Sequence, residues 1–465
     1  MTGAAPLRSS GDFDETYSPS LTHDWFSIAM LTKRLLLTGL ALAAFSLQVS
    51  ADEWPQWRGP TRNGIWRETG LLERFSAPQI PIAWQAEIGP GYSGPTVAGG
   101  RVFVTDRLAE PQQVERIHCF DAHTGKPIWT QSYDCKYEIH YTAGPRAAVT
   151  VDQGRAYNLG AMGHLHCYDA ATGKLLWGRD LNSEYKIRMP VWGIAAAPLV
   201  FSDLVIVMIG GTDGACMVAF DKRSGDERWK ALDDQASYSA PQILQQAGQP
   251  VLVCWTVGGL AGLNPTSGQI YWQLRFVDRD TSMNIAMPVR HKDRLFLTAF
   301  YGGCDMIDLP SDRLEASQLW TRIGQSEQNT DGLHSTMSTP LFASDYIYGV
   351  GSYGELRCLE AATGERVWED LTAVPRARWG NIHFVTNGDR VWMFNERGDL
   401  IIARLTPAGY EEISRAHLID PTDIQLRQRG GVCWSHPAFA YRHVFVRNDE
   451  KLVCASLAAE ENGAE

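Results

Sequence analysis

Short apolar runs, each bounded by glycine or aspartate, recur along most of this 465-residue chain. Typical examples are residues 100–105 (GRVFVT), 203–207 (DLVIV) and 293–297 (DRLFL). Runs of this length that are rich in β-branched and aromatic residues, and that end at turn formers, indicate strands joined by tight turns. The pattern therefore predicts an all-β protein.

A nine-residue motif, Asp-Ala-x-Thr-Gly-x-x-x-Trp in its fullest form, repeats along the chain. Five copies keep an Asp, Asn or Glu eight residues before a Trp, with a Gly between them: 121–129, 169–177, 221–229, 264–272 and 360–368. A sixth copy, Asp308 to Trp320, has four extra residues, and 405–413 keeps only the spacing. We expect the first residue to cap a turn and the Gly to supply a positive φ. We expect the Trp to be buried between neighbouring sheets.

The motif recurs roughly every 45 residues, which is the length of one four-stranded blade of a β-propeller. Seven blade cores are expected, at 95–134, 146–183, 196–236, 239–280, 286–325, 338–373 and 381–418. The predicted blade anchors are Trp84, Trp129, Trp177, Trp229, Trp272, Trp320 and Trp368.

Both ends of the repeat region hold incomplete pieces of sheet. Residues 433–457 contain about three strands, and residues 80–89 around Trp84 have the pattern of a lone outer strand. Pairing the two would complete an eighth blade and remove the free sheet edges. The sequence thus predicts an eight-bladed propeller over 80–457, with seven blades as the fallback. A lead-in segment precedes it at 52–79, and we expect a disordered tail at 458–465.

Composition narrows the class of function. The 43 Gly residues agree with many tight turns, and the 16 Trp residues agree with a large apolar side chain that anchors each repeat. A hydrophobic content of 44% excludes a mainly disordered chain. The net charge of −11 argues against a nucleic-acid-binding protein, which presents a basic face.

The repeated signature resembles the pyrroloquinoline quinone (PQQ) repeat, and residues 54–60 (WPQWRGP) resemble the start of secreted bacterial PQQ-like propeller proteins. Two branches share this repeat. Quinoprotein dehydrogenases oxidise alcohols or sugars with PQQ and Ca²⁺, and the resemblance to them implies a pair of adjacent cysteines, which this chain lacks. BamB is a non-catalytic scaffold of the outer-membrane β-barrel assembly machinery. That branch usually has a lipidated Cys, which is also missing.

From these features we expect a non-catalytic binding or assembly scaffold similar to BamB, with no catalytic residue, metal site or cofactor. The alternative is a soluble alcohol or sugar dehydrogenase with a divergent site for PQQ and Ca²⁺. Cys119, Cys167 and Cys358 precede the motif in three different blades, so we expect them to be small buried residues. His164 and His166 have the spacing of neighbours on one strand face, but no third metal ligand is evident.

The segments that lead into the first strand of each blade, here called the mouth loops, should surround one opening of the central channel. They alternate aromatic, small and polar residues, a composition that suits a concave wall binding a protein, peptide or small ligand. The alternative is that they only pack the inner strands. The candidate binding residues are Tyr92, Tyr141, Arg146, Trp192, Tyr238, His334, Trp379, Trp434 and His436.

Residues 30–51 have the features of a secretory signal peptide. A basic start at Lys33-Arg34 is followed by an apolar run from Leu35 to Leu47 and by Val49-Ser50-Ala51. The run is too short for a membrane-spanning helix, which needs about 20 residues. Residues 1–29 precede a second possible start at Met30, and we expect them to be an extension from a misplaced start codon. The sequence therefore predicts a periplasmic or secreted protein that does not span a membrane.

The first testable prediction concerns processing. Because the small residues Val49 and Ala51 follow a short apolar run, the exported protein should begin at Asp52. N-terminal sequencing of the protein recovered from outside the cytoplasm checks this. An exported chain that still begins at Met1 or Met30 would contradict it.

Overall fold

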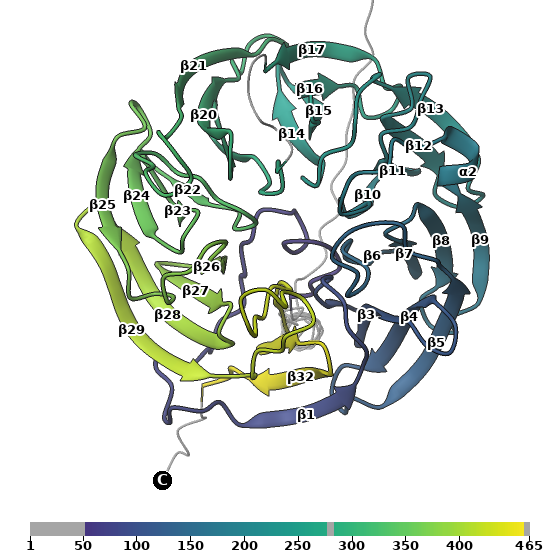
Figure 1. Cartoon of the computed structure of the whole chain (residues 1–465), viewed down its shortest axis with the longest axis horizontal. Coiled ribbons are helices and arrows are strands. Elements are labelled where there is room, and N and C mark those ends of the chain that lie inside the picture. The colour runs from purple at the N-terminus through teal and green to yellow at the C-terminus, as the bar shows by residue number, and fades with distance from the viewer. Residues whose placement is uncertain (1–51, 277–282, 460–465) are drawn as a thin grey trace, which may run out of the picture. The chain divides into compact units, whose positions relative to one another are not determined.

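The computed structural model describes residues 52–276 and 283–459. In this part of the chain, eight four-stranded antiparallel sheets stand around one axis, which Figure 1 views end on. The prediction of eight blades is confirmed, and the seven-bladed alternative is wrong. The expected extension (1–29) and signal peptide (30–51) lie outside the described residues. No helix in the described part is long and apolar enough to cross a membrane.

Seven blades are built from consecutive strands, and the order of strands in each sheet is their order in the chain. Blade 1 comprises β2 (Thr96–Ala98), β3 (Arg101–Leu108), β4 (Val114–Asp121) and β5 (Pro127–Asp134). Blade 2 comprises β6 (Thr150–Asp152), β7 (Arg155–Leu159), β8 (His164–Asp169) and β9 (Leu175–Asp180). Blade 3 comprises β10 (Leu199–Phe201), β11 (Leu204–Met208), β12 (Met217–Asp221) and β13 (Glu227–Ala231). Blades 4 and 5 are β14 (Gln242–Gln246), β15 (Gln249–Trp255), β16 (Gly259–Leu263) and β17 (Ile270–Arg275), then β18 (Val289–His291), β19 (Arg294–Ala299), β20 (Gly303–Asp308) and β21 (Ser317–Arg322). Blades 6 and 7 are β22 (Leu341–Ala343), β23 (Tyr346–Val350), β24 (Leu356–Glu360) and β25 (Arg366–Asp370), then β26 (Ile382–Asn387), β27 (Arg390–Asn395), β28 (Asp399–Thr406) and β29 (Gly409–His417).

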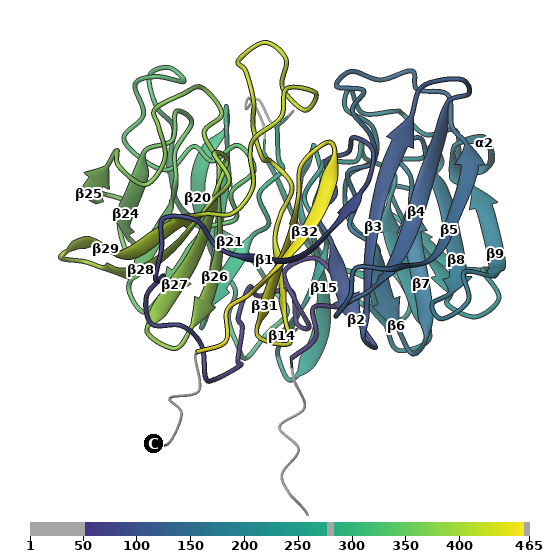
Figure 2. The same ribbon diagram turned by 90° about the horizontal axis from the view of Figure 1, so that it is seen from below.

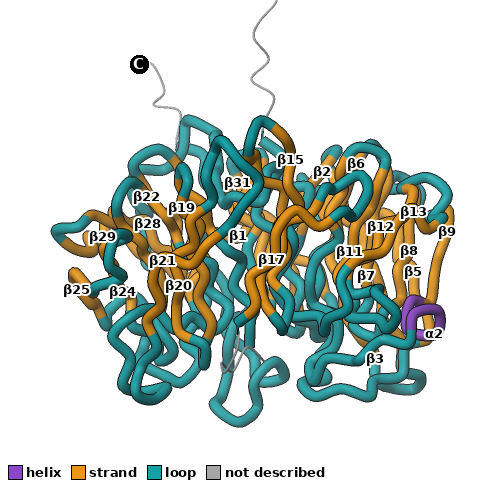
Figure 3. The backbone as a smooth tube through the Cα atoms, turned by 90° about the horizontal axis from the view of Figure 1, so that it is seen from above, coloured by secondary structure: helices purple, strands orange, loops and turns teal. Residues whose placement is uncertain are grey.

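Burial changes across each blade from the inner to the outer strand. The middle strand β3 is buried at all positions except its two ends, whereas the outer strand β5 alternates between exposed and half-buried residues. Middle strands are covered on both faces by neighbouring blades, which explains why β3 is buried even at its polar positions. Figure 3 shows loops at both ends of the strands and one short helix at the rim, α2 (Leu181–Tyr185).

The motif forms the turn between the third and fourth strands. Asp121 Oδ1 accepts hydrogen bonds from the backbone N–H groups of His123 (3.1 Å) and Thr124 (2.8 Å). Gly125 follows with a φ of +68°, which favours glycine. The same turn recurs at Asp169, Asp221 and Asn264. The predicted turn cap and positive φ are therefore present.

The motif Trp of one blade docks on this turn of the next blade. The indole Nε1 of Trp129 donates to the carbonyl oxygen of Ala170 at 3.1 Å. A Cβ added to Gly173 would lie 2.6 Å from the Trp129 ring, so the Gly is also needed for close approach. The same indole-to-carbonyl bond is made by Trp84, Trp177, Trp229, Trp320 and Trp368. The motif therefore links each blade to its neighbour.

Burial of these anchors is less uniform than expected. Trp84, Trp229 and Trp272 are buried, but the other four are only half-buried. All seven anchors lie on outer strands, and four of them keep part of their surface exposed, so the expectation of burial is wrong for those four. The half-buried anchors are Trp129, Trp177, Trp320 and Trp368.

Trp272 docks differently because the next turn is the one that carries extra residues. Its Nε1 donates to Gln246 Oε1 at 2.9 Å, within the same blade. Gln246 Nε2 in turn donates to the carbonyl oxygen of Glu315 at 2.7 Å, in the next blade. The Gln side chain thus bridges the gap that the altered turn leaves.

Blade 8 combines both ends of the chain. Its inner strands are β30 (Ala438–Ala440), β31 (His443–Arg447) and β32 (Lys451–Ser456). The N-terminal strand β1 (Ile82–Glu87) pairs antiparallel with β32 and forms the outer strand. This confirms the predicted closure of the last blade by an N-terminal strand.

Residues 458 and 459 pair with the lead-in segment beside this blade. Leu71 pairs with Ala458, and the N–H of Ala459 donates to the carbonyl oxygen of Gly70 at 2.8 Å. The chain is therefore ordered as far as 459, two residues into the expected disordered tail. Residues 460–465 lie outside the described part.

A pair of glycines tests the docking of Trp anchors on motif turns. Gly225 and Gly214 both have a φ of +78°, but a Cβ on Gly225 would lie 2.7 Å from the Trp177 ring, whereas one on Gly214 meets nothing within 4 Å. Gly214→Ala should lower the free energy of unfolding by about 1–2 kcal/mol through backbone strain. Gly225→Ala should cost about 1–3 kcal/mol more, because the methyl group forces the blades apart. Denaturant unfolding checks this, and equal losses in the two variants would contradict the docking.

Candidate functional site

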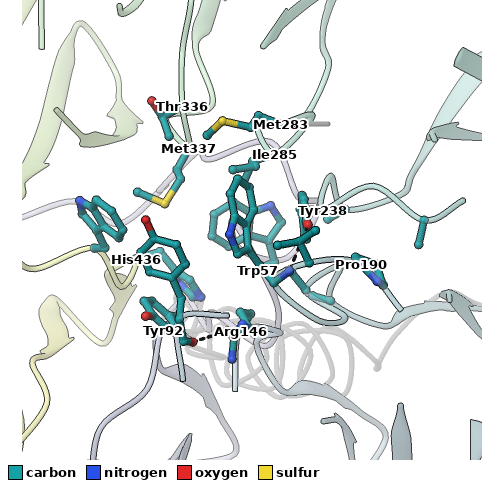
Figure 4. Close-up of a pocket in the computed structure, with 18 of the residues that line it drawn as sticks. Trp57, Tyr92, Arg146, Pro190, Tyr238, Met283, Ile285, Thr336, Met337 and His436 are labelled. Carbon is teal, nitrogen blue, oxygen red and sulfur yellow. Dashed lines mark hydrogen bonds between the residues drawn. The ribbon is translucent and has the colours of Figure 1, made fainter. Parts of the chain in front are cut away.

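A cavity of about 430 Å³ lies at the mouth of the central channel. Residues from the mouth loops of all eight blades line it, so widely separated parts of the chain meet there. Figure 4 shows Met283 and Met337 on one side of the cavity, with Tyr92 and Arg146 on the opposite side. Figure 2 shows the long loop between β29 and β30 projecting from one face of the ring. This loop carries the lining residues Trp434 and His436.

Eight of the nine residues predicted for the mouth line this cavity: Tyr92, Tyr141, Arg146, Trp192, Tyr238, Trp379, Trp434 and His436. His334 does not. Its side chain is buried, its Nδ1 donates to the carbonyl oxygen of Phe300 at 2.9 Å, and its Nε2 accepts from the N–H of Gly324 at 3.1 Å. His334 therefore ties the loop that leads into blade 6 to blade 5, and its predicted place on the cavity wall is corrected.

Several lining residues were not predicted. Met283, Ile285, Met337 and Tyr301 widen the apolar part of the wall. Ile285 lies in a predicted mouth loop and Met283 and Met337 each directly adjoin one, but none of the three is aromatic or polar. Tyr301 lies in the turn between β19 and β20, where the repeat gives no reason to expect a channel residue.

The floor of the cavity comes from the lead-in segment. Trp57 lines the cavity, and residues on either side of it are paired with inner strands: Trp54 with Val97 in blade 1, and Ile65 with Thr386 in blade 7. Figure 1 shows this segment, in purple, crossing the middle of the ring. The lead-in therefore closes the channel beneath the mouth.

Arg62 anchors this floor to blades 3 and 4. Arg62 is 2% exposed, and its guanidinium donates to the carbonyl oxygens of Ala197 (3.3 Å), Pro198 and Pro241 (2.9 Å). It also donates to Gln56 Oε1 at 2.8 Å. Burial lowers the pKa of Arg62 to about 9, so it remains charged at neutral pH. Residues 54–60 contain two Trp residues, which are the one signal in the sequence for a packed segment here.

Two wall aromatics have strained backbones. Tyr141 has a φ of +57° and Trp379 a φ of +65°, in the left-handed region that side chains other than glycine rarely adopt. Such conformations cost about 1–3 kcal/mol each and gather at functional sites. The surrounding loops must therefore hold both aromatics in place.

Ion pairs position Trp379 and Trp434. The Arg378 guanidinium lies 4.4 Å from the Trp379 ring centre and donates to Glu327 at 2.5 Å. On the neighbouring loop, Glu396 accepts from Trp434 Nε1 at 3.2 Å and from Arg429 at 2.6 Å. Burial raises the pKa of Glu396, although Arg429 opposes this. These four charged side chains hold the two Trp residues in place, but none of them lines the cavity itself.

The two histidines of the wall are neutral at pH 7. Burial lowers the pKa of His383 to about 4 and that of His436 to about 3. His383 Nε2 donates to the carbonyl oxygen of Trp434 at 2.9 Å, and His436 meets Trp57 edge to face with ring centres 4.6 Å apart. Their pKa values lie too far from neutrality for efficient general acid or base catalysis.

Arg146 is the one formally charged side chain among the described lining residues. No Asp, Glu or Cys lines the cavity in that part of the chain. Across the described residues there is also no cluster of three or more His, Cys, Asp or Glu placed to hold a metal ion. The rings of His164 and His166 do stack, with centres 6.3 Å apart. Cys119, Cys167 and Cys358 are buried as expected.

A PQQ-like repeat family model described as outer membrane protein assembly factor BamB matches residues 68–140 and 113–370, more than half of the chain. The chain belongs to this family. No curated protein matches it by sequence.

Solved structures with the same fold include members of both branches of this family. BamB from Moraxella catarrhalis aligns over 83% of this chain and 99% of its own, with 16% identity and a TM-score of 0.55. Quinohemoprotein alcohol dehydrogenase from Comamonas testosteroni aligns over 92% of this chain and 83% of its own, with 14% identity and a TM-score of 0.62. A europium-containing methanol dehydrogenase aligns over 85% and 89%, with 13% identity and a TM-score of 0.60. At these identities the likeness concerns the fold alone.

The buried histidines generate a prediction of pH dependence. The folded pKa of His436, about 3, is below that of an unfolded histidine, about 6.5. Between pH 6 and 4 the unfolded chain therefore binds a proton that the folded protein does not, and stability falls as the pH falls. In His436→Gln the slope of unfolding free energy against pH should be smaller by about 1.4 kcal/mol per pH unit. Denaturant unfolding across this range checks it, with the exposed His123→Gln as control. An unchanged slope in His436→Gln would contradict the buried neutral imidazole.

Proposed function

We propose that this propeller acts outside the cytoplasm as a non-catalytic binding protein, a scaffold in the sense of BamB, and that the mouth cavity is its recognition site. The observation that carries the proposal is the wall: aromatic and methionine side chains from loops spread along the chain converge on one cavity. Recognition sites typically combine such apolar surfaces with a few polar groups. The strained conformations of Tyr141 and Trp379 support a functional use of the wall.

Apolar side chains around the mouth extend the recognition surface. Val191, next to Trp192, is 60% exposed, and Tyr301 and Ile424 are 39% and 38% exposed. Exposed apolar groups gathered beside a pocket are typical of surfaces that bind a partner. We therefore propose that a protein or peptide partner, or a small ligand, contacts the mouth. The signal-peptide pattern of residues 30–51 and the family membership support a location outside the cytoplasm.

The quinoprotein alternative is less well supported by the same residues. Calcium is bound mainly by carboxylate and carbonyl oxygens, and no carboxylate belongs to the described wall. PQQ itself carries several carboxylates, but only Arg146 offers a positive charge there. The neutral histidines offer no base near neutral pH. The donor set therefore argues against PQQ with Ca²⁺, and no oxidation step is assigned to these residues.

Binding of an uncharged aromatic dye tests the recognition site. N-phenyl-1-naphthylamine should bind the wild-type protein with enhanced fluorescence. Trp192→Ala/Trp434→Ala should weaken binding by about tenfold or more, since each lost aromatic contact costs about 1 kcal/mol. Trp368→Phe, on an outer strand, is the control. Failure of the wild type to bind the dye would count against the proposal.

A second arm tests the alternative directly. The protein is titrated with PQQ at millimolar Ca²⁺, and alcohol-dependent reduction of an artificial electron acceptor is followed. We expect neither stoichiometric PQQ uptake nor acceptor reduction. Tight PQQ binding together with alcohol oxidation would replace the scaffold with a quinoprotein dehydrogenase.

A further inference from the structure

We infer that the mouth cavity accepts an amphipathic anion: an aromatic compound with one anionic group, whose charge is met by Arg146. This inference rests on the proposed binding function and adds the chemical class of the ligand. It follows from three features of the cavity, namely an unneutralised cation, a loop that fixes its position, and an apolar wall facing it.

Arg146 differs from three other arginines near the mouth because no carboxylate of the described residues pairs with it. Arg188, Arg378 and Arg429 donate to Asp233 (2.7 Å), Glu327 (2.5 Å) and Glu396 (2.6 Å). The Arg146 guanidinium donates only to backbone carbonyl oxygens, those of His140 (3.0 Å), Tyr141 and Gly144. Its charge therefore remains available to a ligand.

The loop around Arg146 holds the guanidinium in one position. Tyr141 has a left-handed backbone conformation, and the carbonyl groups of residues 140, 141 and 144 in this loop all point to Arg146. The guanidinium also lies 4.9 Å from the ring centre of Tyr92 and 5.6 Å from that of Tyr137. Since a guanidinium has five N–H donors and three are used by carbonyls, two are left for an anion.

Glu115, a buried carboxylate beside Tyr137, does not use this charge. Glu115 is fully buried and accepts hydrogen bonds from the hydroxyl groups of Tyr133 and Tyr137 and from the N–H of Ala161 at 3.0 Å. Tyr137 thus contacts Glu115 through its hydroxyl and Arg146 through its ring. The carboxylate is satisfied by its own partners, so it does not neutralise Arg146.

The rest of the wall suits an apolar ring system. The rings of Trp192 and Tyr238 have centres 5.0 Å apart. The backbone N–H of Trp192 donates to the Tyr238 hydroxyl at 3.3 Å. Met283 and Met337 face Arg146 across the cavity in Figure 4, and methionine adapts well to aromatic surfaces. A volume of about 430 Å³ is enough for a small organic molecule.

A single cation also sets the charge of the ligand. A second anionic group would enter the apolar part of the wall without a partner, which is strongly unfavourable. A neutral ligand would leave the Arg146 charge facing an apolar surface. One negative charge on a ring system is therefore the best match to the described lining.

Two dyes that differ by one charge test the inference. N-phenyl-1-naphthylamine is uncharged, and 8-anilinonaphthalene-1-sulfonate adds a sulfonate to the same ring system. At low ionic strength the wild type should bind the sulfonate about tenfold more tightly, the equivalent of about one charge-assisted hydrogen bond. In Arg146→Gln the two dissociation constants should become equal, with that of the neutral dye unchanged. Arg146→Lys should keep part of the preference because the charge remains.

Arg188→Gln is the matched control, since it removes a mouth arginine that is already paired with Asp233. It should leave the preference intact, and thermal melting should show all variants folded. Displacement of the sulfonate dye by the neutral dye shows that both occupy one site. Equal binding of the two dyes by the wild type, or a preference that survives in Arg146→Gln, would overturn the inference while leaving the binding function standing. If neither dye binds, the proposed function itself fails.

Discussion

Closure of the ring is the constraint on which the rest of this structure depends. Blade 8 has only three strands of its own, and its fourth strand, β1, must come from the other end of the chain. To reach that position, the segment before β1 crosses the channel, passing Val97 and Thr386, before it pairs with His417 beside blade 7. Closing the last blade and closing the channel are thus done by one continuous segment. The mouth cavity has a floor because the ring is closed in this way.

Docking between blades explains why the motif recurs with so little change. The Asp or Asn caps the turn, the Gly gives both a positive φ and room for an indole, and the Trp of the preceding blade donates to a turn carbonyl. Where the turn changes, as after Trp272, an added partner is needed, and Gln246 supplies it. Regular docking of the blades brings the mouth loops to one opening. Those loops are then free to differ in sequence, because the outer parts of the blades hold the ring.

The repeated features were predictable from the sequence, and the features that occur once were not. Eight blades, closure by residues 80–89 and eight mouth residues follow from the motif, because equivalent positions in a repeat occupy equivalent places around the axis. His334 was misplaced because sequence position gives the loop but not the direction of the side chain, which here turns toward Phe300. The floor formed by Trp57 and Arg62 belongs to no repeat, and its contacts join segments more than a hundred residues apart. The half exposure of Trp129 depends on ring placement at the rim, which a motif cannot show.

We propose that this floored, apolar cavity, in which Arg146 has no paired carboxylate among the described residues, is a recognition site. The most direct measurement is a crystal structure of the protein with 8-anilinonaphthalene-1-sulfonate. The account predicts one dye molecule in the mouth cavity, its rings beside Trp57 and Trp192 and its sulfonate on the Arg146 guanidinium. A dye ordered on the outer surface of the blades, with none in the mouth, would contradict it.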